Sequence, residues 1–148
     1  MTLRGTKPRS AVTKTAESVV DARVAIYRCF VETGRAPEGL PADTLWRLAD
    51  ERLLVLRPDG AEIWMAQPFS AVPTPFRVEC AGRSYFGNCI WDALGIPALV
   101  EADGTVCTAC ADCGDPLELR VEGGRLLDGG VAHFAVPAAR WWDDIGYT

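Results

Sequence analysis

The sequence predicts an α+β fold, in which a small helical lobe comes first and a mostly β region follows. Apolar residues recur at helical spacing in the first part of the chain, whereas after residue 75 they alternate with polar residues in short runs. Gly and Pro separate these runs, as expected of turns between strands. With 148 residues, 49% of them apolar and 24% charged, the chain is long enough for one domain or for two small lobes that share a core.

The N-terminal part is predicted to contain a tail and two helices. Residues 1–15 carry an unpatterned basic run and are predicted to be a flexible tail. Residues 17–33 place apolar side chains at helical spacing, and Gly34 supplies a stop for that helix. Pro41 or Asp43 can open a second, shorter helix.

A hairpin is predicted to complete this lobe. Two apolar runs, Leu53–Leu56 and Ala61–Met65, flank the turn sequence Arg-Pro-Asp-Gly at residues 57–60. Helices followed by a two-stranded wing suggest a winged-helix-like lobe over residues 16–66. The second helix mixes acidic and basic side chains, and the net charge of the chain is −5. Because phosphate binding needs clustered Lys and Arg, nucleic acid is not expected as a partner.

Residues 67–148 are predicted to form a mixed or antiparallel β-sheet with one short helix packed on it. A Pro-rich connector over residues 67–75 leads into this region. The short helix, which carries the candidate active site, is expected from Cys89 to Leu94, with Gly95 and Pro97 as its stop. The predicted strands cover residues 76–80 and 85–86, the segment that starts at Val106, and residues 117–121, 125–127 and 131–136.

The helix carries the most distinctive pair of polar side chains, Cys89 and Asp92. Residues three apart share a face of a helix, so the thiol and the carboxyl are expected to point the same way. A thiol in the first helical turn also faces the positive end of the peptide dipoles, which favours the thiolate. Such a pair suits the binding of a soft metal and the delivery of a proton. The alternative is a half-buried Cys beside a solvated Asp.

The sequence predicts a cytoplasmic protein that does not bind a membrane. No run approaches the roughly 18 apolar residues of a membrane span, and no apolar segment of a secretory signal follows the basic run. In the cytoplasm thiols stay reduced, so the six cysteines are not expected to form structural disulfides. Cys29 and Cys80 lie on apolar backgrounds and are expected to serve packing. Nothing in the sequence indicates an oligomeric state.

A second thiol cluster is predicted in the turn that holds Cys107, Cys110 and Cys113. Thiols spaced by three and followed by a glycine can aim their sulfur atoms at one ion. A structural zinc site usually has four ligands, and Cys89 or the single histidine, His133, could complete one here. Unliganded thiols, and a His133 that makes one hydrogen bond in a strand, are the alternatives.

Several motifs resemble the organomercurial (alkylmercury) lyase family. The likeness covers roughly residues 60–148 well and the N-terminal part more loosely. Its core is the Cys-x-x-Asp run of Cys89 and Asp92 that leads into Ile-Pro-Ala-Leu, followed by a second Cys-bearing turn. The other stretches that carry the likeness are Trp64–Ser70, Pro73–Phe76, Cys110–Leu117 and His133–Pro137.

The resemblance implies protonolysis of a carbon–mercury bond in a small-molecule organomercurial substrate. Carried over by position, Cys89 is the first metal-binding thiol and Asp92 the proton carrier, and the reaction requires no cofactor. Burial beside Trp91 would raise the pKa of Asp92 and help it to carry the proton. The family uses a further, downstream catalytic Cys, which this sequence lacks. A thiol of the 107–113 turn is the expected substitute.

Three hypotheses remain open from the sequence. The first is a lyase-like enzyme that uses Cys89, Asp92 and a helper thiol. The second is a non-catalytic protein that holds a thiolate-bound metal ion, Hg or Zn. The third is a different reaction in small-molecule metabolism, with Cys89 as nucleophile and Asp92 as acid–base group. The missing downstream Cys favours the last two, whereas the intact Cys-x-x-Asp pair favours the first and the third.

Overall fold

A computed structural model describes residues 11–146, with side chains described from Val19 onward. The N-terminal lobe begins with α1 (Ala11–Thr33) and α2 (Ala42–Asp50), both close to their predicted places. Helix α1 starts earlier than expected, so residues 11–15 are helical although the sequence analysis assigned them to a tail. The rest of the predicted tail, residues 1–10, lies outside the described residues.

The predicted hairpin is confirmed and gains a third strand. Strands β1 (Val55–Leu56) and β2 (Ile63–Ala66) pair antiparallel, and β3 (Phe69–Ser70) adds to β2 inside the segment predicted as a connector. The turn between β1 and β2 closes through a hydrogen bond from the Gly60 amide to the Arg57 carbonyl, 2.8 Å long. The winged-helix-like character of this lobe stays a prediction.

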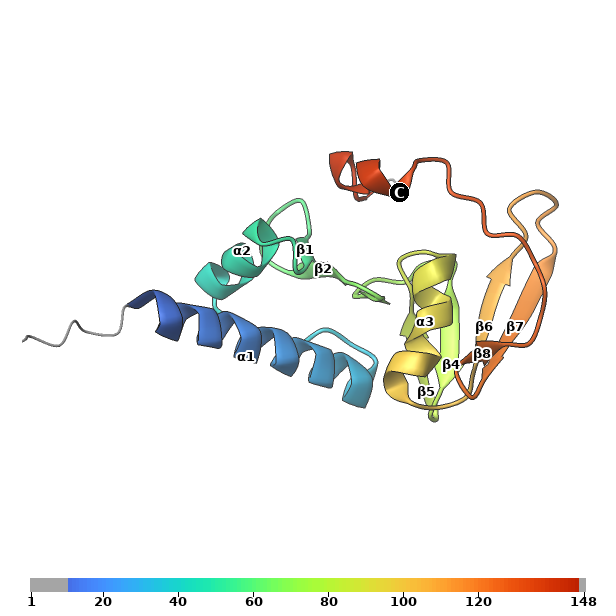
Figure 1. Ribbon diagram of the computed structural model, residues 1–148, viewed down its shortest axis with the longest axis horizontal. Coiled ribbons are helices and arrows are strands. Elements are labelled where there is room, and N and C mark those ends of the chain that lie inside the picture. The colour runs from blue at the N-terminus through green and yellow to red at the C-terminus, as the bar shows by residue number, and fades with distance from the viewer. Residues whose placement is uncertain (1–10, 147–148) are drawn as a thin grey trace, which may run out of the picture.

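The second part of the molecule is a five-stranded antiparallel sheet in the order β5-β4-β6-β7-β8. Its strands are β4 (Arg77–Cys80), β5 (Arg83–Phe86), β6 (Gly104–Ala109), β7 (Pro116–Glu122) and β8 (Arg125–Leu126). Helix α3 (Ile90–Val100) lies against one face of this sheet (Figure 1). The predicted α+β class is therefore confirmed.

Helix α3 is longer than predicted. It continues through Gly95 and Pro97 to Val100 instead of stopping at Leu94, so the expected stop was wrong. A proline inside a helix costs a hydrogen bond, but Pro97 and its neighbour Ile96 are fully buried against the sheet. Burial of these side chains outweighs the local cost, as tertiary packing often does.

The predicted strand over residues 131–136 is wrong. This stretch has no regular secondary structure, and it leads into the 3-10 helix η1 (Ala138–Asp143). The alternating pattern suggested a strand, but the segment does not pack on the sheet, and Val131 is 96% exposed. The segment instead crosses back over the molecule, so that η1 lies above the gap between the N-terminal lobe and the sheet (Figure 1).

The two parts share one hydrophobic core. The ring of Phe30 stacks on Phe69 at 5.0 Å, and Phe69 packs in turn against Tyr85 of β5. The buried Tyr85 hydroxyl donates to the Val31 carbonyl of α1 at 2.9 Å, which ties the lobe to the sheet. Among the described helices, none has a stretch of apolar residues long enough to cross a bilayer.

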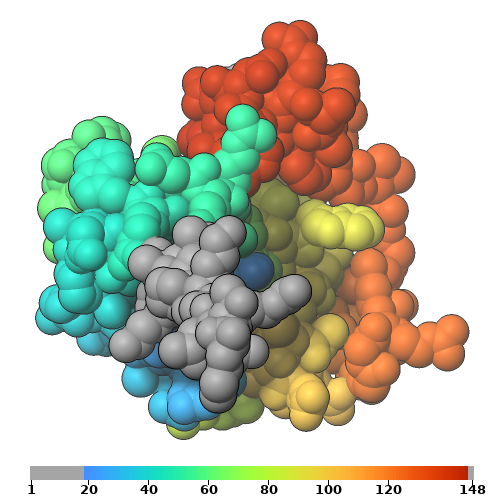
Figure 2. Space-filling view, turned by 60° about the vertical axis from the view of Figure 1, so that its left-hand side comes forward, coloured from blue at the N-terminus to red at the C-terminus, as the bar shows by residue number. Residues whose placement is uncertain are grey.

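The C-terminal segment also contacts the N-terminal lobe. The guanidinium of Arg52 stands 5.4 Å from the centre of the Trp142 ring, and Gly146 lies against the Trp64 ring. In Figure 2 this segment, in red, lies above the yellow region of α3 and reaches toward the cyan lobe. The C-terminal segment is thus packed against residues of the N-terminal lobe.

Candidate active site

Cys89 caps the N-terminus of α3. Its backbone is extended (φ −143°, ψ 179°), and its Sγ accepts a hydrogen bond from the Asp92 amide at 3.5 Å. This bond satisfies one of the amides that the first turn of a helix leaves without a partner. The local sequence therefore places the sulfur directly over the helix start, as the Cys-x-x-Asp spacing predicted.

Asp92 is held from two sides. Its Oδ2 accepts a hydrogen bond of 3.0 Å from Asn88 Nδ2, and its backbone amide donates to the Cys89 Sγ, which keeps the thiol and the carboxyl close together. The Asn88 Oδ1 atom is buried without a partner among the described residues. Sequence reasoning did not single out Asn88, although its position four residues before Asp92 is the spacing of helical neighbours.

Gly87 fixes the distance between α3 and the strand that precedes it. A Cβ atom at this position would lie 2.6 Å from the Ala93 amide nitrogen and 2.7 Å from its Cα. The Gly87 amide donates to the Phe76 carbonyl at 2.9 Å, and its carbonyl accepts from the Thr74 hydroxyl at 2.6 Å. Because the backbones touch, the helix and its two polar side chains have a fixed place relative to the sheet.

Cys89 and Asp92 open into a cavity of about 370 Å³. Aromatic and aliphatic side chains form most of its wall, and the C-terminal segment supplies one side of it. Residues lining the cavity besides the pair are Met65, Gln67, Phe76, Asn88, Ile90, Trp91, His133, Phe134, Ala135, Val136, Trp141, Ile145 and Gly146. The contribution of the C-terminal segment was not foreseen, because residues distant in sequence meet here only through the fold.

The surroundings keep both groups of the pair protonated more readily than usual. Burial raises the pKa of the Cys89 thiol; the amide of Asp92 opposes this, and the Asp92 carboxylate adds to it. The helix start does favour the Cys89 thiolate, as expected, but burial outweighs this effect and the net pKa is raised. Burial also raises the pKa of Asp92, against the hydrogen bonds from Asn88 and Cys89, as the sequence analysis expected. Trp91 itself is 67% exposed, so it is not the main cause of that burial.

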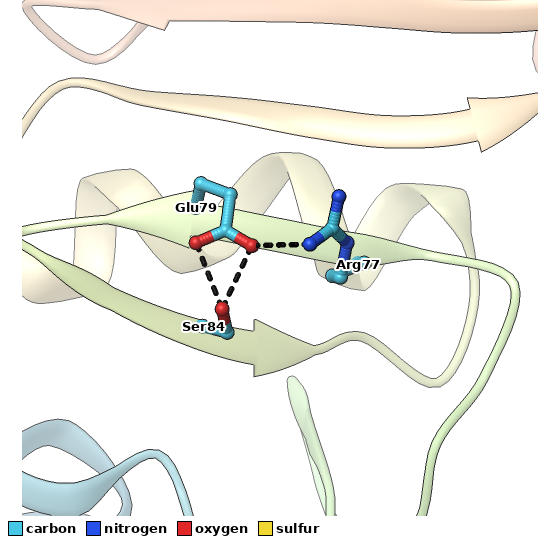
Figure 3. A network of polar contacts seen from close by, with 3 residues as sticks. All are labelled: Arg77, Glu79 and Ser84. Atoms are coloured by element: carbon cyan, nitrogen blue, oxygen red, sulfur yellow. Dashed lines mark hydrogen bonds and ion pairs between the residues drawn. The ribbon is translucent and has the colours of Figure 1, made fainter.

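Cys107 points away from this cavity. It lies opposite Arg77 in the β4–β6 register, and residues directly opposite in an antiparallel pair share a face of the sheet. Figure 3 shows that face, where Glu79 accepts from Arg77 and from Ser84 at 2.7 to 2.8 Å, with α3 behind the strands. The buried Val78 and Cys80 of β4 point to the α3 side instead.

The structure does not bring Cys89 together with the turn cysteines. Cys110 and Cys113 lie in the turn between β6 and β7 and do not line the cavity. Within residues 11–146, no group of three or more His, Cys, Asp or Glu side chains is placed to hold one metal ion. His133 does line the cavity, but from an irregular segment and not from a strand.

Cys80 has the packing role expected of it, whereas Cys29 is only half-buried and is not part of the hydrophobic core. The Cys29 Sγ contacts the Thr33 hydroxyl at 3.7 Å along α1. Cys80 is buried and its thiol donates to the Ala102 carbonyl at 3.7 Å. Burial raises the pKa of Cys80, which keeps that thiol unreactive.

The fold and the site define a mixed α+β protein with a thiol–carboxylate pair in an apolar cavity. A sequence profile of the alkylmercury lyase family, MerB, matches residues 69–148, more than half of the chain. The chain belongs to this family.

A solved structure shares the fold. It is the crystal structure of the mercury-bound form of MerB2, 24% identical in sequence, with a TM-score of 0.56. The match covers 78% of this chain and 65% of that one, so this chain spans less than two thirds of its length. No curated protein sequence matches the chain.

Proposed function

We propose that this protein is an organomercurial lyase-like enzyme, which cleaves a carbon–mercury bond with Cys89 as metal-binding thiol and Asp92 as proton carrier. The observation that carries the proposal is the placement of the Cys89 thiol and the Asp92 carboxyl together at the start of α3, where both line the cavity. Membership of the alkylmercury lyase family supports the same assignment.

The contact between the two groups defines how the proton moves. When an organomercurial cation exchanges its counter-ion for the Cys89 sulfur, an S–Hg bond forms and the thiol proton passes to Asp92. Asp92 then returns this proton to the carbon bound to mercury. The carbon–mercury bond breaks, the hydrocarbon leaves, and mercury(II) stays on the sulfur. Asp92 ends as the carboxylate, and no electron is gained from outside.

The raised pKa values suit both steps. A thiol that keeps its proton until mercury arrives retains that proton for the carbon, and a buried carboxyl with a raised pKa holds it between the two steps. Asn88 Nδ2 holds one oxygen of Asp92 at 3.0 Å, which leaves the other free to face sulfur and carbon. Asn88 therefore acts as a positioning residue.

The wall of the cavity suits an organic group on the metal. Phe76, Phe134 and Trp141 give it an apolar, aromatic surface next to the pair. Such a surface favours alkyl and aryl groups and excludes water from the proton transfer. The apolar lining therefore supports a small organomercurial as the substrate class.

Mercury(II) favours a second thiolate besides that of Cys89. Among the described residues, Cys89 is the cysteine that lines the cavity, and Cys107 faces the other side of the sheet. A soluble monothiol can supply the second sulfur to mercury, weaken the bond to carbon and later remove the metal. Turnover should then depend on added thiol.

The test is release of hydrocarbon from methylmercury or phenylmercury, read by gas chromatography, with and without added monothiol. Wild-type protein should release it, and Cys89→Ser should neither bind the mercurial in the cavity nor release hydrocarbon. Asp92→Asn should still bind the mercurial but lose at least about 100-fold in rate, the size of a general-acid contribution. Cys29→Ser removes a thiol far from the cavity and should behave as wild type.

The same assay separates the alternatives. Mercurial binding by the wild type without any hydrocarbon, at all thiol concentrations, would leave a non-catalytic thiol protein. If neither binding nor release occurs, the pair serves a different Cys/Asp reaction. Either result refutes the lyase proposal.

A further inference from the structure

The turn between β6 and β7 holds two thiols that the proposed reaction does not use. Cys110 and Cys113 lie three residues apart in this one turn. Cys110 is half-buried and Cys113 is exposed, so a solute can reach both. The turn stands at the end of the hairpin, apart from the cavity that contains Cys89 (Figure 1).

The backbone of the turn is arranged around the two sulfur atoms. The Cys110 amide donates to the Asp115 carbonyl at 2.8 Å, and the Gly114 amide donates to the Cys110 carbonyl at 2.9 Å. Gly114 has a positive φ of 76°, which lets the chain reverse directly after Cys113. The two cysteines are therefore presented on one tight turn between paired strands, with little freedom to separate.

Acidic side chains flank the two thiols. Asp112 lies between the cysteines in the sequence, and Asp115 follows Gly114 at the end of the turn. The carboxylates of Asp112 and Asp115 add negative charge beside the thiols, which attracts a cation.

We propose that Cys110 and Cys113 form a dithiol site that chelates one soft, thiophilic cation, with mercury(II) as the ion it suits best. Two S–Hg bonds form and the two thiol protons leave to solvent. Zinc is the poorer occupant, because it takes four ligands and no group of three donors is assembled within residues 11–146. Mercury(II) prefers thiolates and is satisfied by two of them.

This site is separate from the proposed lyase centre. Cys107, the third cysteine of the motif, lies within β6 opposite Glu118 and Arg77, and so its place is fixed by the sheet and not by the turn. Of the three cysteines predicted to form a cluster, only Cys110 and Cys113 therefore belong to the proposed site. It requires inorganic mercury(II) alone and holds whether or not the protein cleaves organomercurials.

The test uses the reduced full chain with Cys89→Ser, which removes the thiol of the cavity. Mercury(II) chloride is added with a small excess of a monothiol, which strips the metal from isolated thiols. Intact-mass spectrometry should show one mercury per chain, and X-ray absorption should show two sulfur neighbours. Cys113→Ser in this background should lower the affinity by at least about 100-fold, because the second sulfur then binds without the benefit of chelation.

Two matched variants control for the other thiols. Cys107→Ser and Cys29→Ser, each in the same background, should leave the stoichiometry and the affinity unchanged. Since Cys113 is exposed, its replacement should also leave the thermal unfolding of the protein unchanged. The proposal is refuted if Cys113→Ser binds mercury as tightly as its parent, if a single sulfur is found on the metal, or if the pair closes to a disulfide and takes up no mercury.

Discussion

Gly87→Ala tests whether the site depends on the close contact between the sheet and α3. The added Cβ would meet the Ala93 amide nitrogen at 2.6 Å and its Cβ at 2.8 Å, whereas ordinary contacts begin at 3.4 Å. The obstacle is backbone, which cannot rotate away, so α3 must retreat by roughly 0.8 Å. Overpacking of this kind costs about 1–3 kcal/mol of unfolding free energy.

This displacement of α3 should also move the two reactive side chains, because Cys89 and Asp92 lie at the start of α3, directly before Ala93. A misplacement of about 1 Å can lower a reaction rate about 100-fold. We therefore expect a clearly lower melting temperature together with a large loss of hydrocarbon release. Differential scanning calorimetry and the methylmercury assay measure the two effects.

Gly95→Ala is the matched control in the same helix. Nothing lies within 4 Å of a Cβ at Gly95, and alanine forms helix better than glycine by about 0.8–1.0 kcal/mol. This variant should be more stable than wild type and equally active. The reasoning fails if Gly87→Ala melts and reacts like wild type, or if the two variants change stability in the same direction.

Three further substitutions probe the polar contacts. Tyr85→Phe removes the hydroxyl that pairs with the Val31 carbonyl and should cost about 1–3 kcal/mol in chemical denaturation, since a buried acceptor loses its partner; an unchanged midpoint would argue against this bond. Burial raises the folded-state pKa of Asp92 above its unfolded-state pKa. The protonated carboxyl therefore contributes to the free energy of unfolding below the unfolded-state pKa, and this contribution is lost as pH rises through the folded-state pKa. Asp92→Asn should therefore gain stability relative to wild type toward neutral pH but not in acid, and a constant difference across the pH range would contradict this. Glu79→Gln disturbs only the exposed contacts on the far face of the sheet and should cost less than about 1 kcal/mol, with hydrocarbon release unchanged.

Local sequence patterns correctly predicted those elements whose structure depends on residues that are neighbours in the sequence. The Cys-x-x-Asp spacing placed a thiol and a carboxyl together, because a helix start and its first turn are determined by neighbouring residues. The Arg-Pro-Asp-Gly turn predicted the β1–β2 hairpin for the same reason. The end of α3 and the strand over residues 131–136 were predicted from local signals alone, and both predictions were wrong. Pro97 was expected to end α3, but its burial decided otherwise.

The parts of the site that the sequence did not predict depend on contacts between distant residues. The alternation at residues 131–136 resembled a strand, yet Phe134 and Val136 line the cavity from an irregular segment. The direction of Cys107 could not be known before its register with Arg77 was fixed. Similarly, the balance between the helix start and burial at Cys89 depends on how much of the thiol the fold covers.

The C-terminal wall of the cavity gives the site a means of exchanging its contents. Its aromatic contacts with the N-terminal lobe, Arg52 on Trp142 and Gly146 against Trp64, lie outside the hydrogen-bonded ladders of either sheet. A segment attached in this way can detach at a lower free energy than that of global unfolding, while the strands and α3 stay in place. Entry of a bulky ligand and departure of a product would then require only this local opening. Amide hydrogen exchange in residues 131–146 should accordingly be faster than in β4 and β6.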